Sequence, residues 1–194
     1  MKTALVDLSF RHDYTVEQIE EIPTGNDIKH VLFPEGSANY ALMIKVTPRK
    51  GSPWVATFAR AYDSPQALTG ILSCPSSEHV CVVSGGGGYI IRASDPDDRQ
   101  KIPLVPITDA RLIKGKGLLV FANFTSLAAY GVGGLLWQSS RLSWDGLRIT
   151  EVTSEHITGL GWDSPREQEI EFVVDIATGL HHGGSSPDGD VPEQ

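Results

Sequence analysis

The residues best able to bind a metal ion lie close together in the stretch CPSSEHVC, which contains Cys74, His79 and Cys81. Thiolates and imidazoles are common zinc ligands, and on a β-strand His79 and Cys81 would point to the same face. The spacing, however, is not that of the paired cysteines of structural zinc sites, and an unpaired cysteine usually behaves as a small buried apolar residue. We therefore predict no metal and no cofactor, with these three residues as the candidate ligands, together with His181 or His182, and expect both cysteines to be free and buried.

Histidines elsewhere in the chain form no recognisable catalytic group. His181 and His182 are adjacent, so on a strand they would point to opposite faces. His12 and Asp13 could act as a base and its orienting carboxylate, but adjacent residues do not easily reach that geometry, and no G-x-S-x-G motif supplies a nucleophile. We predict no catalytic residues. The alternative is an enzyme whose His/Asp site is assembled from distant loops, with the candidates His12, His79, His156 and Asp163.

Tryptophan and arginine, which are enriched at the energetic centres of protein interfaces, mark the candidate binding stretches. The stretch TPRKGSPW, residues 47–54, places two basic residues beside a tryptophan, and two further tryptophans precede aspartates in SWDG and GWDS. The predicted binding residues are Arg49, Lys50, Trp54, Trp144, Asp145, Trp162 and Asp163. The alternative for the tryptophans is a place in the hydrophobic core, because most tryptophan side chains are largely buried.

Two glycine runs, SGGGGY at residues 84–89 and YGVGG at residues 130–134, could bind phosphate only if the N-terminus of a helix followed them. Strand-like sequences follow both runs instead. We therefore predict tight hairpin turns, in which glycine adopts positive φ at little cost.

Short apolar segments separated by Gly, Pro, Asp and Asn predict an all-β, antiparallel fold. The expected strands cover residues 3–10, 28–33, 40–47, 54–62, 68–74, 79–84, 89–93, 102–107, 118–124, 127–130, 135–138, 147–152, 156–162 and 169–176. One short N-terminal helix is expected near residues 16–22, because Thr15 and Gln18 match a capping box and Pro23 would end the helix.

An internal repeat relates residues 79–94 to residues 125–140, which align without a gap. The two glycine runs coincide in this alignment, so each copy has the form strand, glycine turn, strand. The distance along the chain between the two copies is close to the length of a propeller blade. The stretch LLVFANFTSLAAYGVGGLLWQSS resembles the inner strands of such a blade. Residues 118–179 are similar to a group of uncharacterised bacterial proteins with blade-like repeats, through LLWQSSRLSWDGLRIT, GLGWDSP and IEFVVDIATG.

Two blade-like units are too few for a closed propeller, which uses about four to eight blades. We therefore predict an antiparallel two-sheet sandwich or roll built from blade-like repeats at about 68–113 and 114–160, with a small β-propeller as the alternative. Residues 1–182 are assigned to a single all-β domain. Residues 183–194, which are rich in Gly, Ser, Pro and Asp, are expected to form a flexible acidic tail.

Charge is distributed unevenly along the 194 residues. Residues 1–150 contain 15 basic and 14 acidic residues, whereas residues 151–194 contain one basic and ten acidic residues. Such an acidic region repels nucleic acid and membrane surfaces and attracts basic partners. No apolar run reaches the length of a membrane span, and the N-terminus does not resemble a secretion signal, so we expect a cytoplasmic protein.

Without a catalytic motif, these observations favour a non-enzymatic protein-binding module that acts through its acidic C-terminal region on a basic protein partner. A toxin-immunity or assembly protein would fit this description. One alternative is the enzyme with a loop-assembled His/Asp site. The other is a structural protein that forms homo-oligomers, because exposed sheet edges can pair between subunits.

Overall fold

The computed structural model describes residues 4–23, 28–37 and 39–187. Within these residues the chain forms seventeen β-strands and one 3-10 turn, and none of them lies in an α-helix. The all-β class predicted from the sequence is therefore confirmed. The described strands form four open sheets, and these close into neither a barrel nor a propeller. No helix in the described part of the chain is long and apolar enough to cross a membrane.

The chain divides into two compact units, Met1–Pro106 and Ile107–Gln194. The boundary falls inside residues 1–182, which were predicted to form one domain, and that domain assignment stays a prediction. Each unit contains two sheets, so the described chain has four sheets instead of the two expected from the sequence.

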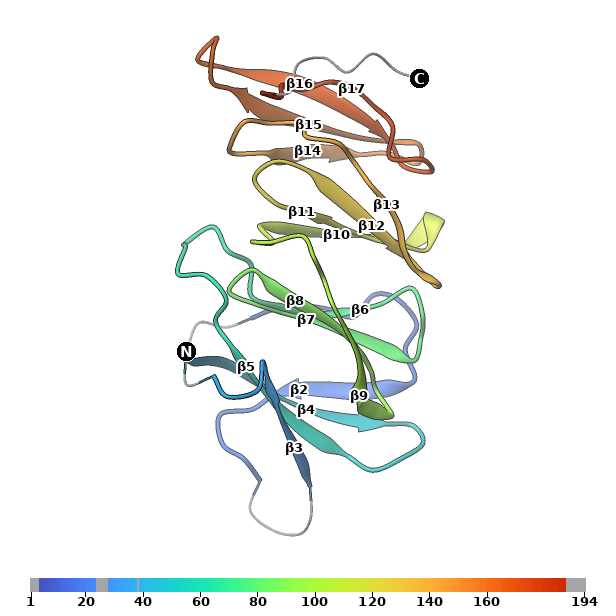
Figure 1. The fold of residues 1–194 in the computed structure, drawn as a ribbon. Helices are drawn as coiled ribbons and strands as arrows, with labels where there is room; N and C mark the ends of the chain where they lie inside the picture. The colour runs from blue at the N-terminus through green and yellow to red at the C-terminus, as the bar shows by residue number, and fades with distance from the viewer. Residues whose placement is uncertain (1–3, 24–27, 38, 188–194) are drawn as a thin grey trace. The chain divides into compact units, whose positions relative to one another are not determined.

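The first unit contains nine strands in two sheets (Figure 1). Their bounds are β1 Leu5–Asp7, β2 Tyr14–Gln18, β3 Lys29–Phe33, β4 Tyr40–Pro48, β5 Trp54–Ala59, β6 Gly70–Ser73, β7 His79–Ser84, β8 Gly87–Arg92 and β9 Asp95–Lys101. One sheet has the order β1-β6-β7-β8-β9 and the other the order β2-β4-β5-β3. The pairs β1–β6 and β3–β5 are parallel, so the predicted antiparallel arrangement holds for all but these two pairs. Long connections in the chain make the parallel pairing possible.

One hydrophobic core fills the space between the two sheets of the first unit. Phe33 and Phe58 stack in it with ring centroids 4.6 Å apart. Trp54 is 1% exposed, and its indole N–H donates to the carbonyl of Ala93 over 2.7 Å. This hydrogen bond satisfies the polar atom of a buried tryptophan and joins β5 to the segment that follows β8.

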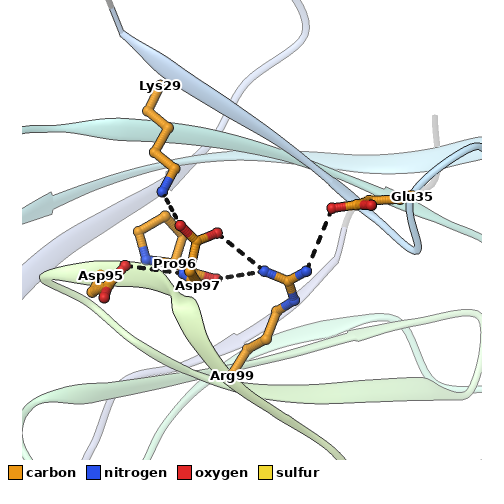
Figure 2. Close-up of polar contacts among 6 residues, drawn as sticks. All are labelled: Lys29, Glu35, Asp95, Pro96, Asp97 and Arg99. Atoms are coloured by element: carbon orange, nitrogen blue, oxygen red, sulfur yellow. Dashed lines mark hydrogen bonds and ion pairs between the residues drawn. The ribbon is translucent and has the colours of Figure 1, made fainter.

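Charged side chains also join these two sheets, between β3 and β9 (Figure 2). Asp97 accepts hydrogen bonds from Lys29 and from Arg99, whose guanidinium also lies 3.7 Å from Glu35. The hydrogen bond from Lys29 holds the pKa of Asp97 below its usual value. The Arg99 guanidinium lies 5.2 Å from the centroid of the Phe33 ring. Because these charges are exposed to solvent, each ion pair contributes little to the stability of the unit.

The helix predicted near residues 16–22 is absent, and Tyr14–Gln18 forms strand β2. This strand pairs with β4, and its burial alternates from the buried Tyr14 to the exposed Thr15 and the half-buried Val16. The capping signal predicted a helix of about two turns, which has little stability of its own. Pairing with β4 and burial of Tyr14 in the core therefore decide the conformation.

Residues 102–107 were predicted to form a strand, and they do not. Ile102, Leu104 and Ile107 are buried, as the apolar pattern indicated. Pro103 and Pro106, however, have no N–H group to donate to a sheet. The preceding charged segment forms β9 instead, at the edge of its sheet.

The second unit contains eight strands in two sheets (Figure 1). Their bounds are β10 Asp109–Ile113, β11 Leu118–Ala122, β12 Leu127–Gly131, β13 Gly134–Gln138, β14 Arg148–Val152, β15 His156–Asp163, β16 Gln168–Asp175 and β17 His181–Gly183, with the 3-10 turn η1 at Lys114–Lys116. Each sheet is a four-stranded antiparallel meander in chain order, β10–β13 and β14–β17. A shared core that includes Trp137, Phe172 and Leu142 lies between them.

Both glycine runs lie in hairpin turns, as predicted. Gly85 and Gly86 connect β7 to β8 with φ of 52° and 77°, values that glycine adopts without strain. In the second hairpin Gly131 pairs with Gly134, so its turn lies one residue later than the repeat alignment implies.

The C-terminal segment predicted as a flexible tail, residues 183–194, begins within the second unit. The backbone N–H groups of Gly184 and Ser185 donate to the carbonyls of Glu171 and Leu142. Residues 188–194 lie outside the described residues.

Candidate functional site

One face of the sheet β14–β17 points away from the core of the second unit. Along β15, buried residues alternate with Thr158, Leu160 and Trp162, and Trp162 is 36% exposed. Neighbours directly opposite on paired strands point to the same face as their partners. We call this surface the outer face, and it comprises Arg148, Glu151, Thr158, Leu160, Trp162, Glu169, Glu171, Val173 and His182.

Carboxylates flank the apolar strip on the outer face. Glu169 lies opposite Trp162, and Glu171 lies opposite Leu160. Arg148 binds Glu169 through two hydrogen bonds of 3.1 and 3.0 Å, and this contact holds the pKa of Glu169 below its usual range. Glu151 and Glu171 take part in no ion pair within the described residues. The outer face is therefore an apolar strip with a net negative rim.

The structure brings together two of the predicted binding residues, Trp144 and Trp162. The backbone N–H of Trp144 donates to the carbonyl of Trp162 over 2.9 Å. The hydroxyl of Ser143 accepts from the N–H of Trp162 over 2.8 Å, which reinforces this contact. The indole N–H of Trp144 donates to Ser185. The loop before β14 is thus attached to the end of β15.

The two predicted aspartates lie in different surroundings. Asp163 is 3% exposed and accepts hydrogen bonds from the backbone and the guanidinium of Arg166, so it stabilises the turn between β15 and β16. Asp145 is exposed in the turn before β14. The binding role predicted for both residues stays a prediction.

The basic loop at residues 47–54 lines a cavity of about 480 Å³ in the first unit. Arg49 and Lys50 lie on its wall with Asp13 and Glu78. Asp13 accepts a 2.7 Å hydrogen bond from Ser77, which together with Arg11 and Arg49 lowers its pKa. Charges of both signs therefore line this cavity. Trp54, the third residue predicted in this loop, lies in the core instead of the cavity wall.

The weak metal candidates do not form a ligand cluster. Cys74 and Cys81 are both free and buried, as expected, and burial raises the pKa of the Cys74 thiol to about 12. Burial also lowers the pKa of His79, whose Nδ1 lies 2.8 Å from the Ser76 hydroxyl. Among the described residues, no three His, Cys, Asp or Glu side chains are placed to hold a metal ion.

Sequence analysis missed one pair with the residue types of a nucleophile and its base. The hydroxyl of Ser140 lies 2.6 Å from Nε2 of His181, and Nδ1 of His181 lies 3.2 Å from the carbonyl of Gly183. Acyl transfer would also need backbone donors for an oxyanion. The nearby N–H groups of Gly184 and Ser185 already donate to carbonyls, so the arrangement is better suited to holding β17 in place.

No protein-family model matches this sequence, and no curated protein matches it either. The similarity to bacterial proteins with blade-like repeats therefore stays a prediction based on the quoted sequence stretches.

Proposed function

We propose that this chain is a non-enzymatic binding module that takes up a basic segment of a partner protein on the outer face of the sheet β14–β17. The observation that carries the proposal is the exposed Trp162, which lies opposite Glu169 and next to the unpaired Glu171. Tryptophan is among the residues enriched at the energetic centres of interfaces. A partner segment with alternating apolar and basic residues would match both the strip and its rim.

The charge of the chain favours a basic partner over a second copy of the chain. Residues 151–194 carry nine more acidic than basic residues, so two outer faces would repel each other. This argues against the oligomer-forming alternative at this surface. Neutralisation of a basic toxin, or a subunit role in an assembly, would each use such a face.

We also propose that the meanders β6–β9, β10–β13 and β14–β17 are copies of one blade-like unit. Support comes from their common form, since each consists of four strands that pair antiparallel with their neighbours in chain order. Under this proposal the outer face of β14–β17 is a surface on which a further sheet-like or extended element can pack.

The test uses a fluorescently labelled synthetic peptide of alternating lysine and leucine, with binding measured by fluorescence anisotropy at low and high salt. Glu169→Gln with Glu171→Gln should weaken binding about tenfold and reduce its salt dependence, because the two changes remove two exposed carboxylates from the acidic rim. Trp162→Ala should weaken binding without changing the salt dependence.

The matched control is Glu20→Gln with Glu21→Gln, which changes the net charge equally but alters exposed residues of the first unit. This control should leave binding unchanged. Equal losses in the two double variants would show that only the total charge matters, and binding that is insensitive to salt would contradict the proposed role of the acidic rim.

A further inference from the structure

A second cavity of the first unit, of about 410 Å³, is lined by cationic and phenolic side chains. Its volume lies within the usual range for small-molecule sites. Its wall includes Arg60, Tyr62, Gly87, Tyr89 and Lys101. No acidic side chain is among the residues that line it in the described part of the chain.

The two cations are available to a ligand. Lys101 lies at the end of β9 opposite Tyr89, is exposed, and forms none of the ion pairs found in the described residues. Arg60 makes one long contact, 3.4 Å, with Asp63, whose side chain is 97% exposed. Such an exposed ion pair contributes little, so an anion in the cavity can replace it at small cost.

The two tyrosines supply flat surfaces and hydroxyl groups. Tyr62 is 42% exposed, and the ring of Tyr89 is held edge-on against Phe33 at 5.1 Å. Burial raises the pKa of Tyr89, so its hydroxyl keeps its proton and can donate to an anion. Ser84, directly opposite Gly87, also has a buried hydroxyl without a partner in the described residues.

The glycine run at residues 84–89 packs closely against residues 60–62, which form part of the cavity wall. A Cβ atom on Gly85 would lie 2.4 Å from Cγ of Arg60, and one on Gly87 would lie 2.6 Å from Cβ of Ala61. The backbone N–H groups of Ala61 and Tyr62 donate to the carbonyls of Ser84 and Gly85. The run therefore positions Arg60 and Tyr62 through close packing, although no helix follows it.

We propose that this cavity binds a small organic anion that combines a flat ring with one phosphate or carboxylate group. Arg60 and Lys101 would bind the anionic group, and the rings of Tyr62 and Tyr89 would contact the flat one. The cavity lies in the first unit, so the inference does not depend on the binding role proposed for the outer face.

Isothermal titration with phenyl phosphate tests this inference, with inorganic phosphate, benzoate and phenol as comparison ligands. Phenyl phosphate should bind at submillimolar concentration. It should bind more tightly than inorganic phosphate, which lacks the flat ring, and more tightly than phenol, which lacks the anionic group. Benzoate reports whether the site accepts a carboxylate in place of the phosphate. No heat of binding with either phenyl phosphate or benzoate at millimolar concentration would overturn the proposal.

Lys101→Gln and Arg60→Gln should each weaken the binding of phenyl phosphate roughly tenfold, because each removes one charge-assisted contact. Lys116→Gln is the matched control, since Lys116 is an exposed lysine of η1 in the second unit. It should bind like the unchanged protein. Equal weakening in Lys101→Gln and Lys116→Gln would overturn the assignment, and urea unfolding of each variant verifies that it is folded.

Discussion

Trp137 donates its indole N–H to the backbone carbonyl of Ile176 over 2.8 Å, and this bond joins the two sheets of the second unit. Trp54 makes the same bond to the carbonyl of Ala93 in the first unit, and 39 residues separate donor and acceptor in both cases. In both units the acceptor directly follows the third strand of a four-stranded meander, β8 or β16. In each unit, one buried tryptophan therefore links the two sheets that enclose the core.

We expect Trp54→Phe and Trp137→Phe each to lower the free energy of unfolding by about 2 kcal/mol, because each change leaves a buried carbonyl without its partner. Trp162→Phe, the matched change at an exposed tryptophan, should shift it by no more than about 0.5 kcal/mol. Urea unfolding measures all three. A loss at Trp162 as large as that at Trp54 would contradict the burial described for these side chains.

Gly179→Ala should destabilise the second unit by about 2–4 kcal/mol, because its φ is +77° and an added Cβ would lie 2.7 Å from the Trp137 ring. Gly133→Ala is the matched change in the hairpin β12–β13, where no atom lies within 4 Å of the added Cβ. It should alter stability by less than about 0.5 kcal/mol. Thermal unfolding distinguishes the two, and equal effects would mean that Gly179 does not pack on Trp137.

Neither cysteine should react with a thiol reagent in the folded protein at neutral pH, because burial raises the pKa of both thiols. Both should react once the chain is unfolded in guanidinium chloride. Since the folded-state pKa values lie above the ordinary value of 9.0, the unfolding free energy should fall as the pH rises beyond that value. Rapid modification of one thiol in the native protein would place that residue outside the core.

Lys29→Met should raise the pKa of Asp97 toward its ordinary value of 3.8, because the hydrogen bond from Lys29 is the largest cause of its lowered pKa. A carboxylate with a lowered pKa stabilises the folded state above its ordinary pKa, and the effect is lost as the pH falls through the lowered value. An NMR titration of the Asp97 carboxyl measures the change. Lys50→Met, at an exposed lysine of the same unit, should leave the pKa of Asp97 unaltered. A titration curve of Asp97 in Lys29→Met identical to that in the unchanged protein would refute the ion pair.

Much of the strand pattern was predictable from local sequence. The strand predicted at residues 79–84 coincides with β7, and the strands predicted at residues 40–47 and 54–62 correspond to β4 and β5, which pair antiparallel. Alternating or continuous apolar residues and Gly or Pro turns are properties of single segments, so they can be recognised without knowing the partner strand. Charged segments give no such signal, and β9, with the sequence DPDDRQK, was missed for that reason.

The candidate site was predictable as a set of residue types and not as an arrangement. Sequence analysis selected Trp144 and Trp162, but the backbone hydrogen bond between them depends on a loop crossing the end of β15. It also grouped Arg49 and Lys50 with Trp54, although the first two line a cavity and the third is buried. On a strand, one residue more or less reverses the direction of a side chain, so exposure depends on the exact register.

Local sequence was enough to predict the all-β class and the glycine hairpins, and it places most of the negative charge near the C-terminus. The folded chain was needed to show that Tyr14–Gln18 is a strand, that Trp54 and Trp137 link facing sheets, and that Trp162 is exposed among carboxylates. The difference arises because hairpins and charge density depend on neighbours in the chain. Pairing between strands and burial between sheets depend on residues that are brought together only when the chain folds.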